Sequence, residues 1–533
     1  MERPAPDEPT RAPTDRVVFG VAALLVLIFL GWGVSSPGSL GAFADAALRW
    51  AVKDIGWVFA LVTTGFVVFV GWLALSRYGA IPLGRDGEQP EFRTPSWIAM
   101  MFIAGMGIGL MFFGVAEPLA HYAQPPPDSF APTGEAAVRA SLATTLFHWA
   151  LHPWAIYSVV GLAIGYGAFR RGRKQTISAA FTPLLGSRPA TKPIGKAIDV
   201  LALWATLFGS AASLGIGTLQ INSGMRSAGW IGAAGGATLV LIIGVLTICF
   251  VASAVSGVAR GIQWLSGINV ALAASLLLFV LITGPTVFVL SLIPTAIGNY
   301  VADFAEMAGR AGATGDDAVD EWLSAWTIFY WAWWISWAPF VGTFLARISR
   351  GRTIRQFVGG VLLVPSAVSV VWFAVFGGTA IDLQRHGTDV TAAGGEETQI
   401  FAVINALPIP AVITALVIVL VAIFFITGAD SASLVMGKFS QHGTISPSKW
   451  MIVFWGVATG SVAAIMLLSG GDDALEGIQN VTFLASVPFA LVMVLMCVSL
   501  SQDLRADDLI ERRRRAEARL AALVESDERD PPA

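Results

Sequence analysis

Tryptophan and tyrosine side chains gather deep inside two of the long apolar runs of this sequence. They lie about 10–15 residues from the ends of those runs, which places them near the middle of a bilayer at a rise of about 1.5 Å per residue. Their faces would attract a cation that cannot donate hydrogen bonds, such as a quaternary ammonium group. We therefore predict an aromatic cage, with ordinary core packing as the alternative. The residues concerned are Trp149, Trp154, Tyr157, Trp333, Trp334 and Trp337.

Three glycines alternate at Gly105, Gly107 and Gly109 within another apolar run. Small residues of this kind often serve close helix packing. Their alternation also favours a helix that unwinds, and the amides freed at such a break can receive a carboxylate. Together with the aromatic cage, these amides indicate a site for a small zwitterion.

Hydroxyl groups occupy the same predicted depth, at Thr206 and Ser210 one turn apart and at Thr427. We expect no carboxylate among the aromatic residues of the layer. His148 and His152 stand four residues apart on one helix, but no partnering acid is evident, so we interpret them as helix-packing groups. A site near the bilayer midplane is where secondary transporters bind their cargo.

The elements that must position these residues are membrane helices. The chain has 533 residues, of which 55% are hydrophobic and 13% are charged, about half the usual charged fraction of a soluble domain. We predict twelve spans, which exclude a soluble enzyme or a nucleic-acid-binding protein. They lie near residues 17–35, 56–76, 97–122, 139–168, 194–221, 229–255, 263–294, 322–347, 356–380, 411–437, 449–469 and 479–500.

The basic residues predict the orientation of these spans. With both termini cytoplasmic, 27 of the 33 Lys and Arg residues fall on the inner side, as the positive-inside rule requires. We therefore expect a multi-pass protein of the bacterial inner membrane. Its predicted segments are a cytoplasmic tail (1–16), two leading helices (17–96), a five-helix unit (97–294), an outer amphipathic helix and loop (295–321), a second five-helix unit (322–500) and a basic cytoplasmic tail (501–533).

Three motifs together resemble the betaine–carnitine–choline transporter family: Gly105–Pro118, Phe147–Tyr157 and Trp331–Arg352. The resemblance extends over residues from roughly 15 to 505. It implies an all-α fold like that of the sodium symporters, in which the two five-helix units are inverted repeats, and a homotrimeric assembly. The implied activity is secondary uptake of glycine betaine by sodium symport for osmoprotection.

The resemblance also assigns roles to individual residues. Trp149, Trp154, Tyr157 and Trp334 would form the aromatic box, Trp337 would flank it, and Trp333 would line the cytoplasmic exit. Gly107, Ile108 and Gly109 would contact substrate through the unwound segment. One sodium ion would bind to Ile103, Met106, Phe424 and Thr427. A second would bind near Thr206, Ser210, Tyr157 and Phe340. No cofactor other than sodium as coupling ion is implied.

Two positions bear on alternatives within the family. Gly428 stands where a serine hydroxyl would usually complete the first sodium site. Proton-coupled choline transport is the nearest alternative, but choline-type members tend to carry an acidic residue where this chain has Gly109, which favours betaine over choline. Carnitine, ectoine, proline and dimethylsulfoniopropionate are further candidate cargoes.

Two peripheral segments complete the prediction. Residues 297–308 show apolar side chains on one face, typical of an amphipathic helix on the outer surface and resembling the family's helix at the subunit contact. The tail around Glu511–Leu523 has helix-forming composition and four consecutive arginines. Such a tail either anchors the topology or binds anionic lipid as a regulatory helix.

Overall fold

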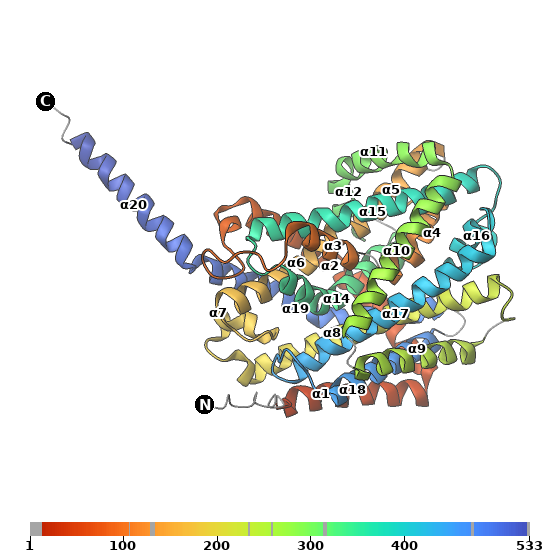
Figure 1. The fold of residues 1–533 in the computed structure, drawn as a ribbon, viewed down its shortest axis with the longest axis horizontal. Coiled ribbons are helices and arrows are strands. Elements are labelled where there is room, and N and C mark those ends of the chain that lie inside the picture. The colour runs from red at the N-terminus through yellow and green to blue at the C-terminus, as the bar shows by residue number, and fades with distance from the viewer. Residues whose placement is uncertain are drawn as a thin grey trace, which may run out of the picture.

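The computed structural model describes residues 13–105, 107–127, 134–232, 235–256, 259–312, 317–470 and 474–529. Over these ranges the regular structure is helical, apart from one isolated bridge between Pro82 and Thr353. Long helices pack side by side into one bundle, and a single helix near the C-terminus projects from it (Figure 1). The predicted all-α membrane class is therefore confirmed.

Nine helices within the described ranges are long and apolar enough to cross a membrane. Each corresponds to one of the twelve predicted spans. They are α1 (Arg16–Ser35), α2 (Pro37–Leu75), α8 (Pro193–Ser227), α9 (Gly236–Ser256), α10 (Ala259–Thr283), α15 (Ile354–Arg385), α17 (Pro410–Ser440), α18 (Lys449–Ser469) and α19 (Ala474–Arg505).

The three other predicted spans are each divided into shorter helical pieces. They are the runs that carry the glycine motif and the two aromatic stretches. The pieces are α3 (Thr94–Gly105) and α4 (Ile108–Ala123), then α5 (Gly134–Trp149), α6 (Leu151–Gly165) and the π-helical η2 (Tyr166–Arg170), and finally α13 (Asp317–Leu323), the π-helical η5 (Ser324–Ile328) and α14 (Phe329–Ile348). Irregular backbone inside a membrane is tolerated where protein buries it or a cavity adjoins it.

The divided helices form the inner part of the bundle. α14 packs against α6, α8 and α19, and α4 packs against α5 and α15. Apolar helices such as α9 and α10 lie outside them and expose many side chains, whereas most of α8 is buried. Apolar helices can remain exposed to lipid, because lipid does not drive them together. Polar groups need partners inside the protein, so we look for them in the buried interior.

Two predicted boundaries are wrong. α2 begins at Pro37, about twenty residues before the predicted span, because Leu40, Ala44 and Leu48 keep a buried stripe at helical spacing. The outer helix predicted for 297–308 is instead two helices, α11 (Thr286–Ala302) and α12 (Phe304–Gly309). The chain breaks earlier, at Gly284-Pro285, because proline disfavours the α conformation of the residue before it. The predicted boundary between 294 and 295 therefore falls inside α11.

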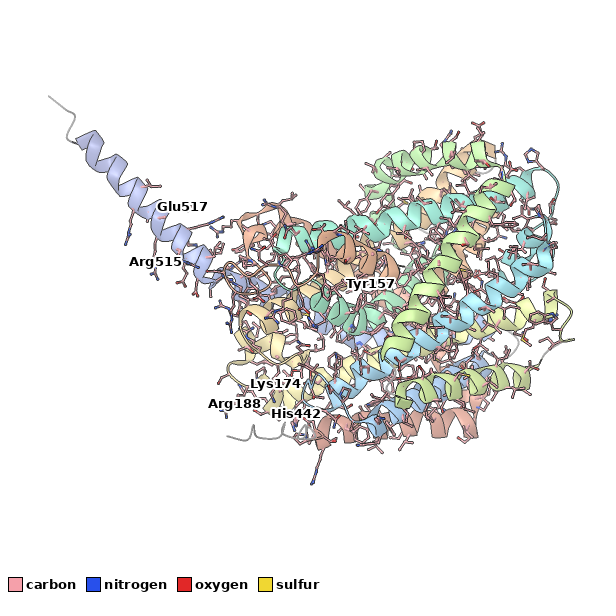
Figure 2. The ribbon with its side chains drawn as sticks, viewed as in Figure 1. Tyr157, Lys174, Arg188, His442, Arg515 and Glu517 are labelled. Carbon is pink, nitrogen blue, oxygen red and sulfur yellow. The ribbon has the colours of Figure 1, made fainter. Side chains whose placement is uncertain are left out.

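Short helices occupy the connecting loops. They are α7 (Thr182–Leu185), α16 (Glu396–Asn405), η1 (Arg77–Ala80), η3 (Ser178–Phe181), η4 (Pro189–Thr191) and η6 (Thr391–Ala393). The loop after α6 lies at the same end of the bundle as the start of α1 and the end of α19. Lys196 is 3.4 Å from Asp15, and Arg173 donates a 2.8 Å hydrogen bond to Asp503. Lys174, Arg188 and His442 lie at this end in Figure 2.

The C-terminal helix α20 (Asp508–Arg529) extends away from the bundle (Figure 1). Its base is attached, because Arg170 donates a 2.8 Å hydrogen bond to Asp507 and Arg512 pairs with Asp86. Arg515 and Glu517 lie on the projecting part (Figure 2). The predicted helix in the tail is confirmed, and its predicted contact with lipid stays a prediction.

Candidate substrate and ion site

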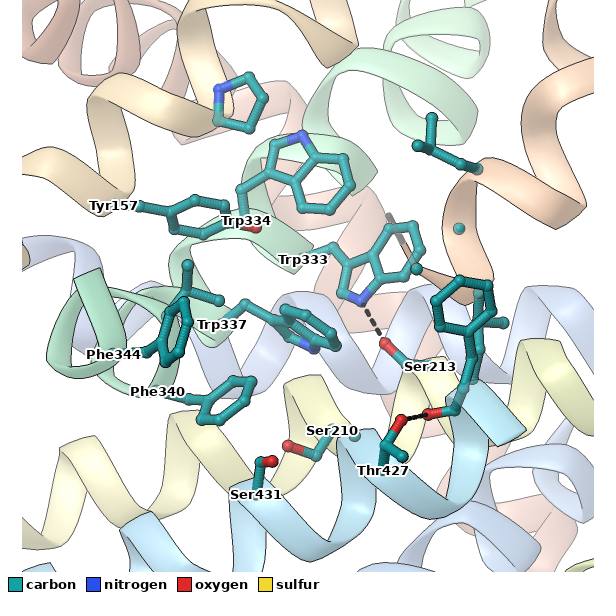
Figure 3. Close-up of a pocket in the computed structure, with 18 of the residues that line it drawn as sticks. Tyr157, Ser210, Ser213, Trp333, Trp334, Trp337, Phe340, Phe344, Thr427 and Ser431 are labelled. Atoms are coloured by element: carbon teal, nitrogen blue, oxygen red, sulfur yellow. Dashed lines mark hydrogen bonds between the residues drawn. The ribbon is translucent and has the colours of Figure 1, made fainter. Parts of the chain in front are cut away.

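A cavity of about 240 Å³ lies between the divided helices and α8, α10, α15 and α17. Its wall gathers most of the residues predicted for the site (Figure 3). All nine substrate-binding candidates line it, together with four of the candidate ion ligands. These residues are Gly107, Ile108, Gly109, Trp149, Trp154, Tyr157, Trp333, Trp334, Trp337, Ser210, Phe340, Phe424 and Thr427.

The break between α5 and α6 places Trp149 on this wall. Pro153 lacks an amide proton, and its ring conflicts with the carbonyl four residues earlier, which is that of Trp149. The helix opens at Ala150, and the two freed carbonyls find partners on other helices. Trp334 Nε1 donates to the His148 carbonyl at 3.1 Å, and Ser369 Oγ donates to the Trp149 carbonyl at 3.0 Å. The break is therefore held open by packing on both sides.

The glycine motif breaks the neighbouring helix as predicted. α3 ends at Gly105, and α4 begins at Ile108 after an extended Gly107. The first amides of a helix have no partner inside the helix and carry the positive end of its dipole. Residues 107–110 line the cavity, so this end of α4 suits an anionic group. Met106 lies outside the described residues.

Four tryptophans and a tyrosine stand close together along the cavity. The rings of Trp149 and Trp334 meet edge to face with centroids 4.9 Å apart, and Trp334 stacks on Trp333 at 4.7 Å. The rings of Trp154 and Tyr157 are 5.4 Å apart at 82°. Rings that meet at steep angles turn several π faces toward one space, which is the arrangement that holds a quaternary ammonium.

Hydrogen bonds fix two of these rings from behind. Trp337 Nε1 donates to the Gly209 carbonyl at 2.7 Å, and Trp333 Nε1 donates to Ser213 Oγ at 3.2 Å (Figure 3). The indole N–H groups are thereby satisfied by α8. Trp333 also stacks on Trp334 and on Phe329, so these two neighbours take up much of its π face.

Oxygen atoms of α17 approach the cavity beside the start of α4. Thr427 Oγ1 lies 3.4 Å from the Phe424 carbonyl and donates to the Ile423 carbonyl at 2.8 Å. Ile103 stands in the last turn of α3, whose carbonyls have no partner within the helix. A hydroxyl and carbonyls are suitable ligands for a hard cation. A Cβ added at Gly428 meets no described atom within 4 Å, so a serine there would have room.

The second predicted ion site is brought together only in part. Ser210, Tyr157 and Phe340 line the cavity. Thr206 lies one turn away on α8 and does not line it. Its hydroxyl is fully buried and donates to the Ala202 carbonyl at 2.7 Å.

Sequence reasoning missed a polar residue of the wall. Asn269 on α10 is 2% exposed and lines the cavity, and within the part of the chain that the structure describes neither its side-chain oxygen nor its nitrogen has a hydrogen-bond partner. A buried amide without partners is costly unless water or a ligand satisfies it. The isolated asparagine in an apolar helix was the available signal.

The expectation that no carboxylate accompanies the aromatic residues is wrong. Glu117 on α4 is fully buried and accepts hydrogen bonds from Trp149 Nε1 at 2.6 Å and from Tyr330 Oη at 2.5 Å. Its other oxygen lies 2.6 Å from His148 Nδ1. His148 therefore does have a partnering acid, and it is more than a helix-packing group. His152 lies 3.3 Å from Thr64 Oγ1 and stacks on Trp331, in keeping with a packing role.

The fold and this site define a multi-pass membrane transporter. Residues 17–509 match the family model described as betaine/carnitine/choline family transporter. The match covers most of the chain, so the protein belongs to that family and is not an enzyme.

Known relatives extend over nearly the whole chain. The betaine/ectoine transporter LcoP of Corynebacterium glutamicum is 43% identical over 96% of this chain and 81% of its own. The glycine betaine transporter OpuD of Bacillus subtilis is 44% identical over 92% and 93%. Among solved structures, a substrate-bound outward-open Na⁺-coupled sialic acid symporter aligns with a TM-score of 0.45 and 14% identity, over 84% of this chain and 86% of that one. That likeness is too low to carry an argument about ion coupling.

Proposed function

We propose that this protein takes up a zwitterionic compatible solute, glycine betaine first and ectoine second, by sodium symport. The observation that carries the proposal is the composition of one cavity. Aromatic rings line one part of it, and the amide end of α4 lines another, at Gly107–Leu110. A zwitterion satisfies both parts, and two relatives are named for betaine or ectoine transport.

The cationic head would lie against Trp149, Trp154, Tyr157 and Trp334, with Trp337 beside it. Each cation–π contact contributes about 0.5–2 kcal/mol, and more as water leaves. The carboxylate would lie at the start of α4. Gly109 supports a zwitterion over a plain cation, because none of the described residues at that end of the cavity has an acidic side chain.

Sodium coupling is supported by the oxygen atoms around the cavity. The proposed first site uses Thr427, the carbonyls of Phe424 and Ile103, and Met106. The proposed second site uses Ser210 with Tyr157, Phe340 and Thr206 nearby. The absence of a hydroxyl at Gly428 makes the first site the weaker of the two.

Uptake assays in cells that lack their own solute carriers test this function. Labelled glycine betaine, ectoine, choline and carnitine are supplied in sodium buffer and again with potassium in its place. We expect saturable betaine uptake that needs sodium. Uptake that ignores sodium and collapses with a protonophore would replace sodium by protons, and a clear preference for choline would favour the alternative cargo.

The assembly and topology are further proposals. Twelve spans, with two inverted five-helix units after two leading helices, would leave both termini in the cytoplasm of a bacterial inner membrane. The exposed apolar side chains of α11, including Val287 at 79% and Val301 at 68%, suit a subunit contact in a homotrimer. Cross-linking of cysteines placed at these positions in native membranes tests the trimer, and accessibility of a tag at each terminus tests the orientation.

A further inference from the structure

A buried carboxylate lies directly behind the wall of the cavity. Trp149 separates the two, because its ring lines the cavity while its Nε1 donates to Glu117. Glu117 does not line the cavity. It sits with His121 and His148 in one fully buried group, which we call the Glu117 cluster.

The carboxylate is satisfied without a bound cation. Trp149 and Tyr330 donate to one oxygen, and His148 lies at hydrogen-bond distance from the other. Two or three neutral donors stabilise an ionised carboxylate even when it is buried. With Glu117 ionised and both histidines neutral, the cluster would carry one negative charge immediately behind the aromatic wall.

The same cluster can accept a proton without rearranging. His148 Nε2 lies 3.0 Å from Thr327 Oγ1, and a hydroxyl can either donate to a neutral imidazole nitrogen or accept from a protonated one. His121 Nε2 lies 3.4 Å from Glu117, and neither ring nitrogen of His121 has a hydrogen-bond partner among the described residues. The cluster would then titrate as a unit, changing between one negative charge and none.

Other charges act on this cluster from a distance. Three other titratable groups among the described residues interact electrostatically with this region. Arg310 interacts with both histidines of the cluster, His152 with His148, and Glu396 with Tyr330. None of these lies within hydrogen-bond distance of Glu117 in the described structure, so the carboxylate and its two histidines remain the groups that exchange the proton.

A metal ion is a poorer occupant than a proton. Glu117 Oε1 and His148 Nδ1 are 2.6 Å apart, a hydrogen-bond distance. Two ligands of one tetrahedral zinc, each about 2.0–2.1 Å from the metal, stand roughly 3.3 Å apart. The donors of Trp149 and Tyr330 also occupy the oxygen that a metal would need.

We propose that the Glu117 cluster is a proton-binding site that sets the affinity of the aromatic cage for a cationic head group. Deprotonated, it orients the Trp149 indole and adds a negative charge behind the ring. Protonation removes that charge and weakens the attraction. The inference rests on the proposed function for its substrate, but the site itself is defined by the residues behind the cage.

Binding of labelled glycine betaine to the purified full chain, at saturating sodium and over roughly pH 4–8, which spans the ordinary titration ranges of carboxyl and imidazole groups, tests this proposal. We expect the wild-type affinity to fall about tenfold toward acid pH, as loss of a nearby charge in a medium of low dielectric predicts. The Glu117→Gln variant should bind glycine betaine weakly at every pH, and its affinity should show no pH-dependent transition. Thr327→Val should shift the pH-dependent transition in affinity to lower pH, because protonated His148 loses the hydroxyl that accepts its hydrogen bond.

Each other outcome counts against the proposal. A wild-type affinity independent of pH, or a pH-dependent step that survives in Glu117→Gln, would overturn it. If the Glu117→Gln variant does not fold, the proposal is tested by Thr327→Val, and an unshifted pH-dependent transition in that variant would overturn it. If no solute binds at all, the proposed function fails separately. The cluster is then tested by the pH dependence of tryptophan fluorescence in the substrate-free protein, which the Glu117 change should abolish and which a merely structural Glu117 would not show.

Discussion

Gly109 faces the indole of Trp149 so closely that a Cβ at position 109 would lie 2.6 Å from Trp149 Cη2 and 2.9 Å from Trp333 Cη2. Contacts below 3.0 Å force one of the groups to move. The absence of a side chain at 109 is therefore a condition of the aromatic cage. An aspartate introduced there would displace both rings, so it cannot serve as a simple test of charge preference.

Gly109→Ala should raise the KM for betaine at least fivefold, because overpacking costs about 1–3 kcal/mol and here the rings must give way. Gly65→Ala provides the matched control, since Gly65 also lies within a helix, α2, a Cβ there meets no described atom within 4 Å, and the position lies outside the cavity wall. Uptake kinetics, normalised to the amount of carrier in the membrane, measure both. Equal KM values for the two variants would contradict the packing argument.

Trp334→Leu and Trp149→Leu should each abolish saturable uptake at ordinary substrate concentrations. Loss of one desolvated cation–π contact of about 2 kcal/mol already weakens binding roughly thirtyfold. Trp230→Leu is the control, because this tryptophan is 57% exposed and lies outside the cavity wall. An unchanged KM in Trp334→Leu would show that the cage is misplaced.

Gly428→Ser should lower the sodium concentration needed for half-maximal uptake. The position lines the cavity and has room for a side chain, and the new hydroxyl would add a ligand beside Thr427. Gly428→Ala separates the effect of the hydroxyl from that of helix propensity. Sodium titrations of uptake give the answer, and identical sodium dependence in the serine and alanine variants would argue against an ion at this place.

Truncation after Leu509 should leave transport intact and change only its response to external osmolality. Anionic liposomes at rising salt provide the assay, because each basic residue near such a surface contributes about 1 kcal/mol that salt screens. Arg512→Ala removes the contact with Asp86 together with a hydrogen bond to the Asp508 carbonyl within α20, and Arg513→Ala is the exposed control. A truncated carrier that responds as strongly as the full chain would make the tail a simple anchor.

The contact of α20 with the bundle should persist at neutral and mildly acidic pH. Hydrogen bonds from Arg170 and Arg512 hold the pKa of Asp86 below its usual value of 3.8. A group whose pKa is lower in the docked state stabilises docking above its usual pKa and loses that contribution as pH falls through the lowered value. Hydrogen exchange of the first turns of α20 measures the contact, and release near pH 6 would point to another group.

Much of the site followed from the sequence, because its determinants are local. The position of a residue along an apolar run predicts its depth in the bilayer. The glycines, the indoles and Thr427 have similar predicted depths and were therefore expected in one layer. Gly105 to Gly109 and Pro153 interrupt helices through their own backbone chemistry. These properties need no knowledge of neighbouring helices, and the structure places Gly107, Gly109, Pro153, the indoles and Thr427 on the wall of one cavity.

The tertiary structure decided which buried polar groups meet. Tyr330 reaches Glu117 across 213 positions of the chain, and Asn269 lines the cavity from α10, a helix made mostly of apolar residues. No local pattern encodes such pairings, because a polar group inside a membrane takes whichever partner the helix packing presents. The residues of the cage could therefore be predicted from the sequence, whereas the contacts of Glu117 behind the cage depend on how α4, α5 and α14 pack together.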